Sequence, residues 1–366
     1  MTDRIEEPDR IEGAPHPRET ARLFGQDTAE AAFLDAFTTG RIHHAWLLTG
    51  PRGVGKATLA WRIARFLLAQ PEGIPQTLAL PPDHPVARRV AALSEPGLFL
   101  LRRTWDEKAR PQRLKAVITV DEVRKLKEFF ALAATDGGPR VVLVDCVDEM
   151  NPNAANALLK LLEEPPAKAT LLLISHQPAR LLPTIRSRCR ELRLPALPPD
   201  AMALALEQAG TAPGKDAAAL AALSGGSVGE AIRLANLGGL ELYAEIVALM
   251  GGIPKLDRAR AIKLAQTLAA REAQARFDLF LGLVDLFLAR TARTGIAGPP
   301  TPEATPGEAA LLTRLCPNPD IARHWAESAQ TLGIRARQGR AVNLDPAALI
   351  LDTVLRMDET AAKCVA

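Results

Sequence analysis

The stretch LLTGPRGVGKATLAWRIARFLL, residues 47–68, is the most informative part of the chain about its fold. It carries the phosphate-loop pattern G-x-x-x-x-G-K-[ST] with Gly50, Gly55 and Lys56 in place, but Ala57 stands where the pattern has Ser or Thr. The short apolar run HAWLLT precedes the glycines, and the residues after the lysine place apolar side chains at helical spacing. Strand, glycine loop and helix in this order predict a genuine phosphate loop within an α/β fold.

The loop predicts a nucleotide site that lacks one of its usual ligands. Its glycines let backbone N–H groups converge on a phosphate, and Lys56 can reach the β- and γ-phosphates. The Mg²⁺-binding hydroxyl is missing at Ala57, and Thr58 is rotated by roughly 100° along the helix, which makes it a poor substitute. Two interpretations stay open: a loop that binds ATP or ADP, and a loop kept for strand–helix packing. The candidate nucleotide-binding residues are Gly50, Gly53, Gly55, Lys56, Thr58 and Asp145.

A second apolar run, Val141 to Val144, ends in Asp145. This pattern predicts a buried strand whose terminal carboxylate helps to hold Mg²⁺. The next residue is Cys146, and a thiol is a poor base for water. Asp148 and Glu149 follow, and we interpret them as a solvated entrance to the next helix.

Two further strands are predicted on either side of this one. One runs from Thr170 to Ile174 and is followed by Ser175, and a short one is expected upstream, from Val117 to Thr119. Ser187-Arg188-Cys189 follows the strand of residues 170–174. Alone, a basic stretch of this kind is typical of a solvated surface. After a phosphate loop and an acid-terminated strand, in that order, it becomes a candidate functional motif.

Four segments together resemble the clamp-loader family of AAA+ proteins, and within it the delta-prime group of bacterial DNA polymerase III. They are GRIHHAWLLTGPRGVGKATLA, NALLKLLEEPP, LPTIRSRC and LSGGSVGEAIRLA, all within about residues 17–235. Beyond that range only the helical architecture is similar. The resemblance implies an AAA+ core with a parallel sheet, a small helical lid and an all-α collar that joins subunits into a ring.

The resemblance also implies roles for single residues. In this family the arginine of the S-R-C motif reaches a neighbouring subunit's ATP, so Arg188 is implied to be an arginine finger acting in trans. Ser175 stands at the family's polar sensor position, and Cys146 replaces the catalytic glutamate. Gly229 stands where the motor subunits carry a sensor-2 arginine. With Ala57, three catalytic groups are missing while the finger remains, so the resemblance implies no intrinsic ATPase activity.

The function that the resemblance implies is a non-catalytic, stator-type subunit of the DNA polymerase III holoenzyme. Its implied partners are the gamma/tau and delta subunits, the sliding clamp and, through the complex, primed DNA. One alternative is an active ATPase motor subunit, gamma/tau-like, of the same complex or of a DNA-repair machine. Another is a stand-alone phosphate-loop transferase, for which neither S-R-C nor NALLKLLEEPP is expected.

Composition bounds these interpretations. The chain has 366 residues, 48% of them hydrophobic and 24% charged, which indicates a globular protein of two to three domains. The net charge of +3 is weak evidence for nucleic-acid binding. No apolar run reaches transmembrane length and the N-terminus has no signal-peptide core, so we expect a cytoplasmic protein without a membrane partner. Four cysteines occur, and none forms a C-x-x-C pair. Proteins of the family that the chain resembles often carry a four-cysteine zinc module in the span that corresponds to residues 70–116, which has no cysteine here, so we expect neither structural zinc nor disulfides.

The expected organisation has four parts. Residues 1–17 are charged and predict a mobile tail, and residues 18–194 form the AAA+ core. Residues 195–237 form the lid, and residues 238–366 the helical collar. The segment TGIAGPPTPEATPGE within the collar is rich in Pro and Gly and is expected to be mobile.

Overall fold

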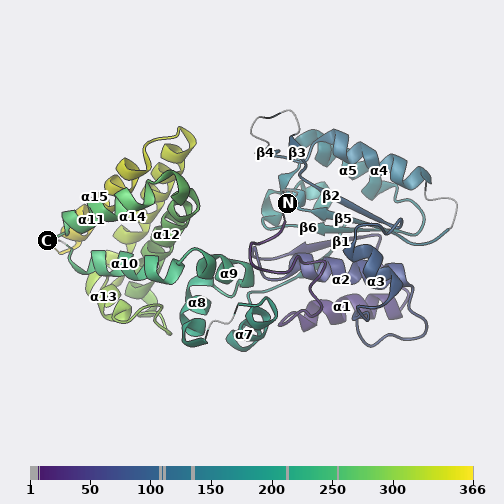
Figure 1. The fold of residues 1–366 in the computed structure, drawn as a ribbon, viewed down its shortest axis with the longest axis horizontal. Coiled ribbons are helices and arrows are strands. Elements are labelled where there is room, and N and C mark those ends of the chain that lie inside the picture. Colours follow the sequence, from purple (N-terminus) through teal and green to yellow (C-terminus); the bar gives the residue numbers. More distant parts are fainter. Residues whose placement is uncertain are drawn as a thin grey trace. The chain divides into compact units, whose positions relative to one another are not determined.

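The computed structural model describes residues 7, 9–106, 109, 113–132, 137–211, 214–253 and 255–365 (Figure 1). The chain divides into two compact units, one of residues 1–211 with 226–230 and one of residues 212–225 with 231–366. Residues 1–6 of the expected tail lie outside the described residues. Among the described helices no single one is long and apolar enough to cross a membrane, although the bent pair 228–236 and 239–251 passes the same test together.

The first unit is built on a five-stranded parallel sheet. Its strands are β1 (Ala45–Thr49), β2 (Leu98–Arg102), β5 (Arg140–Asp145), β6 (Ala169–Ile174) and β7 (Arg190–Arg193), in the order β2-β5-β6-β1-β7. β1 and β6 are buried along their whole length, because helices cover both faces of a parallel sheet. A separate ribbon pairs β3 (Trp105–Asp106) with β4 (Arg113–Leu114). The predicted parallel α/β core is confirmed.

One predicted strand is wrong. From Val117 to Thr119 only Ile118 forms a β-bridge, with Met150. The N–H of Ile118 donates to the carbonyl of Glu149 at 2.8 Å, and its own carbonyl accepts from Asn151 at 3.1 Å. The pairing stops there because the chain enters helix α4 (Val120–Leu132) at the next turn.

Helices cover the two faces of the sheet in separate layers (Figure 1). One layer contains α1 (Asp27–Thr38), α2 (Lys56–Ala69) and α3 (Pro85–Ala91), and the other contains α4 and α5 (Pro152–Glu163). Phe33 of α1 packs on Trp46 of β1, with ring centroids 5.0 Å apart. On the opposite face Leu126 and Leu158 join one buried cluster with Leu47. Neighbouring residues of β1 therefore serve opposite layers, as strand alternation requires.

Residues 9–16, which we call the N-terminal strap, pack against the first unit, and the mobility expected over residues 1–17 stays a prediction. His16 is fully buried, and its ring lies edge-on to Trp61 of α2 at 6.1 Å between centroids. Just beyond the strap, Arg62 of α2 donates to the carbonyl of Ala21 at 2.6 Å. The strap is held by the burial of His16 and by the ion pair between Asp9 and Arg102 of β2.

The second unit is helical. Its elements are α8 (Ala217–Ser224), most of α9 (Val228–Asn236), α10 (Gly239–Gly251), α11 (Arg258–Leu268), α12 (Gln274–Ala297), α13 (Glu308–Leu315), α14 (Pro319–Ala341) and α15 (Pro346–Val365). The two long helices α12 and α14 form its most extensive contact. α6 (Pro183–Arg186) and α7 (Pro199–Gln208) belong to the first unit. The helices of the expected lid thus fall in both units, and the separate lid stays a prediction.

A buried ion pair organises the second unit. Glu308 is fully buried, and its carboxylate accepts from Tyr243 Oη at 2.6 Å, Arg290 Nε at 2.7 Å and the N–H of Ala304 at 2.7 Å. Arg290 also donates to the carbonyl of Ala222 in α8 at 3.4 Å. Burial and the adjacent Glu308 raise the pKa of Tyr243. These bonds pin the loop between α12 and α13, which the sequence had indicated to be mobile.

Candidate nucleotide and arginine-finger sites

The glycine loop between β1 and α2 has the backbone that a phosphate loop needs. Gly50, Gly53 and Gly55 have φ angles of 138°, 77° and 102°, a region that side chains disfavour. At Gly50 a Cβ atom would also lie 2.1 Å from the carbonyl oxygen of Leu194. Glycine is therefore required there for close backbone packing as well as for conformation.

The loop carbonyls all accept hydrogen bonds from within the protein. Lys56 Nζ donates to the carbonyl of Gly50 at 2.7 Å and to that of Pro51. The carbonyls of residues 52, 53 and 54 accept from Ser227 Oγ at 2.8 Å, the N–H of Gly229 at 3.1 Å and Gln26 Nε2 at 3.1 Å, in that order. The loop conformation is thus fixed by its surroundings.

The N–H groups of the loop, unlike its carbonyl groups, are not paired with other described parts of the protein. Those of residues 52–56 donate to no acceptor in the part of the chain that the structure describes. Consecutive N–H groups at a helix N-terminus form an anion-binding nest. Burial lowers the pKa of Lys56 to about 8, and the charges of Asp145 and Asp148 oppose this fall. The loop therefore keeps the groups that bind a phosphate.

The position after the lysine offers no metal ligand. Ala57 and Thr58 lie in the first turn of α2 and are both half-buried. Ala57 has no oxygen, so the Mg²⁺-binding hydroxyl of the pattern is absent. A contact of Thr58 with nucleotide stays a prediction.

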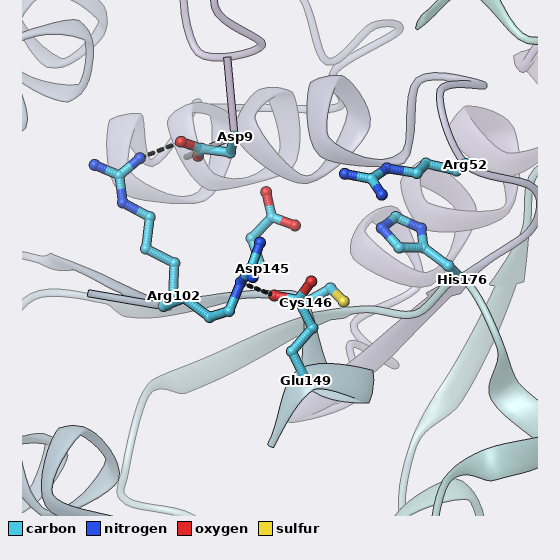
Figure 2. A pocket seen from close by; sticks show the side chains of 8 residues that line it. Asp9, Arg52, Arg102, Asp145, Cys146, Glu149 and His176 are labelled. Atoms are coloured by element: carbon cyan, nitrogen blue, oxygen red, sulfur yellow. Dashed lines mark hydrogen bonds and ion pairs between the residues drawn. The ribbon is translucent and has the colours of Figure 1, made fainter. Parts of the chain in front are cut away.

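A small polar pocket lies beside the loop (Figure 2). It is lined by Asp9, Arg52, Arg102, Arg103, Asp145, Cys146, Glu149 and His176. In Figure 2, Asp9 and Arg102 occupy one side, Arg52 and His176 the other, and the Asp145 carboxylate points between them. Burial and the negative charges of Asp9 and Glu149 raise the pKa of Asp145 to about 7.

Cys146 cannot act as a base in this pocket. Its side chain is buried, and burial together with the charges of Glu149 and Asp148 raises the pKa of its thiol. The thiol lies 3.7 Å from Asp148 Oδ2, to which it donates. A neutral thiol at physiological pH takes no proton from water.

His176 is a pocket residue that the sequence reasoning missed. Its Nδ1 atom is buried without a hydrogen-bond partner among the described residues. Burial lowers the pKa of the imidazole to about 4, and the charges of Lys56 and Arg52 act in the same direction. The ring is therefore neutral at physiological pH. The only available signal was its position directly after Ser175, the polar residue that follows β6.

Asp148 is not the solvated helix entrance that we expected. Its carboxylate accepts from Ser175 Oγ at 2.7 Å, from the N–H of His176 and from the N–H of Gln177 at 3.2 Å. It therefore ties the segment after β5 to the end of β6. No local pattern reveals this contact, because the partners lie 27 to 29 residues away.

Replacing Asp148 with alanine is expected to destabilise the first unit by about 2 kcal/mol, because two backbone N–H groups lose their acceptor. Urea unfolding followed by circular dichroism measures this. The matched control is Asp121→Ala, since that side chain is 75% exposed and bonds only within its own helix turn. Equal midpoints for both variants would contradict the structural role of Asp148.

Gly229 closes the loop from the side of α9. Besides its bond to Gly53, a Cβ atom at position 229 would lie 3.1 Å from Gly53 Cα and 3.0 Å from Ile11 Cδ1. A side chain at this position would therefore require Ile11 or the loop backbone to shift by a few tenths of an ångström.

Arg188 lies far from this loop, in the turn between α6 and β7. Its guanidinium is 2.9 Å from Glu163 Oε1 and donates to the carbonyl of Thr184 at 3.1 Å, and its side chain is 36% exposed. β7 runs parallel to β1 with Arg190 opposite Trp46. Arg188 therefore lies near the N-terminal ends of the strands, where β1 begins. The phosphate loop follows the C-terminal end of β1, on the opposite side of the sheet.

The described residues hold no group of three or more His, Cys, Asp or Glu side chains that could bind a metal ion. All four cysteines are free. The absence of structural zinc stays a prediction for metal analysis of the purified protein.

The chain is similar in sequence to several named proteins. The family model described as "DNA polymerase III, delta subunit" matches residues 25–198. The delta-prime subunit of Pseudomonas aeruginosa is 40% identical over 242 residues, which cover 65% of this chain and 69% of that one. The delta-prime subunit of Escherichia coli is 35% identical, over 54% of this chain and 56% of that protein. The tau subunit of E. coli is 34% identical over 50% and 26% of the two chains.

Among solved structures, a gamma-subunit-related protein from Thermotoga maritima aligns with a TM-score of 0.37 at 17% identity, covering 90% of this chain and 99% of that one. That similarity is low, and the family assignment rests on the sequence relatives. The identity to the P. aeruginosa protein extends over more than two thirds of that relative. The chain therefore belongs to the delta-prime family of DNA polymerase III subunits.

Proposed function

We propose that the chain is a non-catalytic, stator-type subunit of the DNA polymerase III clamp loader and that Arg188 serves ATP bound to a neighbouring gamma/tau subunit. The observation that carries this is the position of Arg188 at the edge of the sheet opposite the chain's own loop. The relatives support membership of a hetero-oligomeric complex. The delta subunit, the sliding clamp and primed DNA are further partners in this proposal, and the complex works in the cytoplasm.

The chemistry of Arg188 fits a finger that acts in trans. A guanidinium is planar and always charged, so it can stabilise the charge that spreads over a transferred phosphoryl group. Two bonds, to Glu163 and Thr184, orient the side chain while leaving it accessible. Core residues 18–194, a lid at 195–237 and a collar at 238–366 complete the proposed organisation.

The second candidate is an active motor subunit, and one observation favours part of it. The open N–H groups of the loop support binding of ATP or ADP. Hydrolysis, however, needs groups that this site does not offer: Ala57 gives no metal ligand, Cys146 is a neutral buried thiol, and Gly229 has no side chain. Nucleotide binding without turnover is the reading that the geometry supports.

The purified chain alone is expected to hydrolyse ATP far more slowly than about 1 per second, a rate typical of working enzymes. A steady-state phosphate-release assay measures this. Lys56→Ala is the control, because it removes the side chain that would hold the phosphates. Turnover near 1 per second that disappears in this variant would make the chain a motor and overturn the proposal.

A further inference from the structure

The N-terminal strap crosses the candidate nucleotide site. Asp9 enters the pocket and pairs with Arg102 at the end of β2 (Figure 2). Ile11 packs at Gly229, the residue bonded to Gly53 of the phosphate loop. The strap ends where His16 is buried against α2. Its path therefore runs over both the pocket and the loop.

The Asp9 carboxylate is held in place as a charged group. The Nδ1 atom of His16 accepts from the N–H of Arg18 at 3.1 Å, and its Nε2 atom lies 3.1 Å from Asp9 Oδ2. Burial alone would raise the pKa of Asp9, but His16 and Arg102 hold it below its usual value. Asp9 therefore brings a negative charge into a pocket that already contains Asp145.

The charge of Asp9 is stabilised by Arg102 and His16 and opposed by other groups in the pocket. Asp9 lies near two other carboxylates, Asp145 and Glu149, and like charges in a partly buried pocket repel one another. The ion pair between Asp9 and Arg102 is explained if the Asp9 carboxylate occupies the position in which Arg102 would otherwise bind another anion. The loop N–H groups next to the strap have no acceptor among the described residues, which is the arrangement a phosphate requires.

We infer that the strap is an internal competitor for the nucleotide site, with the Asp9 carboxylate occupying Arg102 in place of a nucleoside phosphate. A phosphate bound at the loop brings negative charge toward Asp9 and disfavours the closed strap. Arg102 then exchanges a carboxylate for a phosphate. The apparent affinity for nucleotide is reduced by the fraction of chains whose strap is open.

Asp9→Asn keeps the shape of the side chain and removes its charge. We expect it to tighten binding of a fluorescent ADP analogue, with Mg²⁺ present, by about tenfold, since it raises the binding-competent fraction. Asp83→Asn, at an exposed position away from the pocket, is the matched control and should bind like the unmodified chain. Adding Lys56→Ala to Asp9→Asn should abolish the gain, which places the bound nucleotide at the loop.

Hydrogen exchange on the unmodified chain gives a second readout that needs no variant. Saturating MgADP should speed exchange of amides within residues 9–16 while slowing that of residues 52–56. Equal affinities for Asp9→Asn and the control, no binding by any variant, or binding that leaves strap exchange unchanged would each overturn the inference. None of these results depends on Arg188 or on partner subunits, so they test the strap separately from the proposed function.

Discussion

Replacing Arg188 with alanine in an assembled complex is expected to slow ATP hydrolysis at the neighbouring subunit by on the order of 10³-fold, the lower range for loss of an arginine finger. The finger acts only in the transition state, where charge spreads over the transferred phosphoryl group. Its loss should therefore lower kcat far more than it changes nucleotide affinity. Clamp loading should fail in parallel.

The same substitution should hardly affect folding or assembly. Arg188 and Glu163 are 36% and 49% exposed, and an exposed ion pair contributes less than about 1 kcal/mol. Arg188→Lys should also fail, because a point charge does not reproduce the planar fork. The measurement is clamp- and DNA-stimulated ATPase activity of the complex reconstituted with its gamma/tau and delta subunits.

Arg186→Ala is the matched control, since Arg186 is an exposed arginine at the end of α6, two residues before Arg188. It should leave hydrolysis near the unmodified rate. Complexes that contain Arg188→Ala, assemble normally and hydrolyse ATP like unmodified ones would reduce Arg188 to a basic surface residue. The in-trans role would then have to be abandoned.

The core sheet was predictable because its signals are local. The buried runs that became β1, β5 and β6 are continuous apolar segments, and the glycine loop has a fixed spacing. The run at Val117 had similar composition, but its neighbour on the chain is a helix N-terminus, so only Ile118 pairs. Short apolar runs do not reveal where pairing stops.

The groups around the site were harder to predict because their partners are distant in sequence. Asp9 looks like part of a charged tail until Arg102, 93 residues away, is placed beside it. Asp148 looks solvated until the end of β6 supplies its donors. In both cases a charged residue is fixed by tertiary contacts that no local pattern contains. The loop before α13 was misread for the same reason, because Glu308 has its partners on other helices.

The second large effect is expected in the helical unit. Glu308→Ala should destabilise it by about 3–5 kcal/mol, because it leaves the guanidinium of Arg290 buried without its countercharge. Arg290 is only 13% exposed and Glu308 not at all. Tyr243 Oη and the N–H of Ala304 lose their acceptor in the same step. The melting temperature of this unit should fall by roughly 10 °C, measured by calorimetry.

Two further variants separate charge from packing. Glu303→Ala removes an exposed carboxylate of the same loop, which accepts from the N–H groups of Gly307 and Ala309. Its loss should cost about 1 kcal/mol, as for other caps. The double change Glu308→Leu with Arg290→Met removes both charges and should recover much of the stability, because a buried pair replaced by apolar side chains leaves no uncompensated charge. A double variant no more stable than Glu308→Ala would show that the lost hydrogen bonds, to Tyr243 and Ala304, dominate instead.

Because Arg290 also bonds Ala222, the destabilised variants should release α8 from α12, which limited proteolysis near residue 222 would detect.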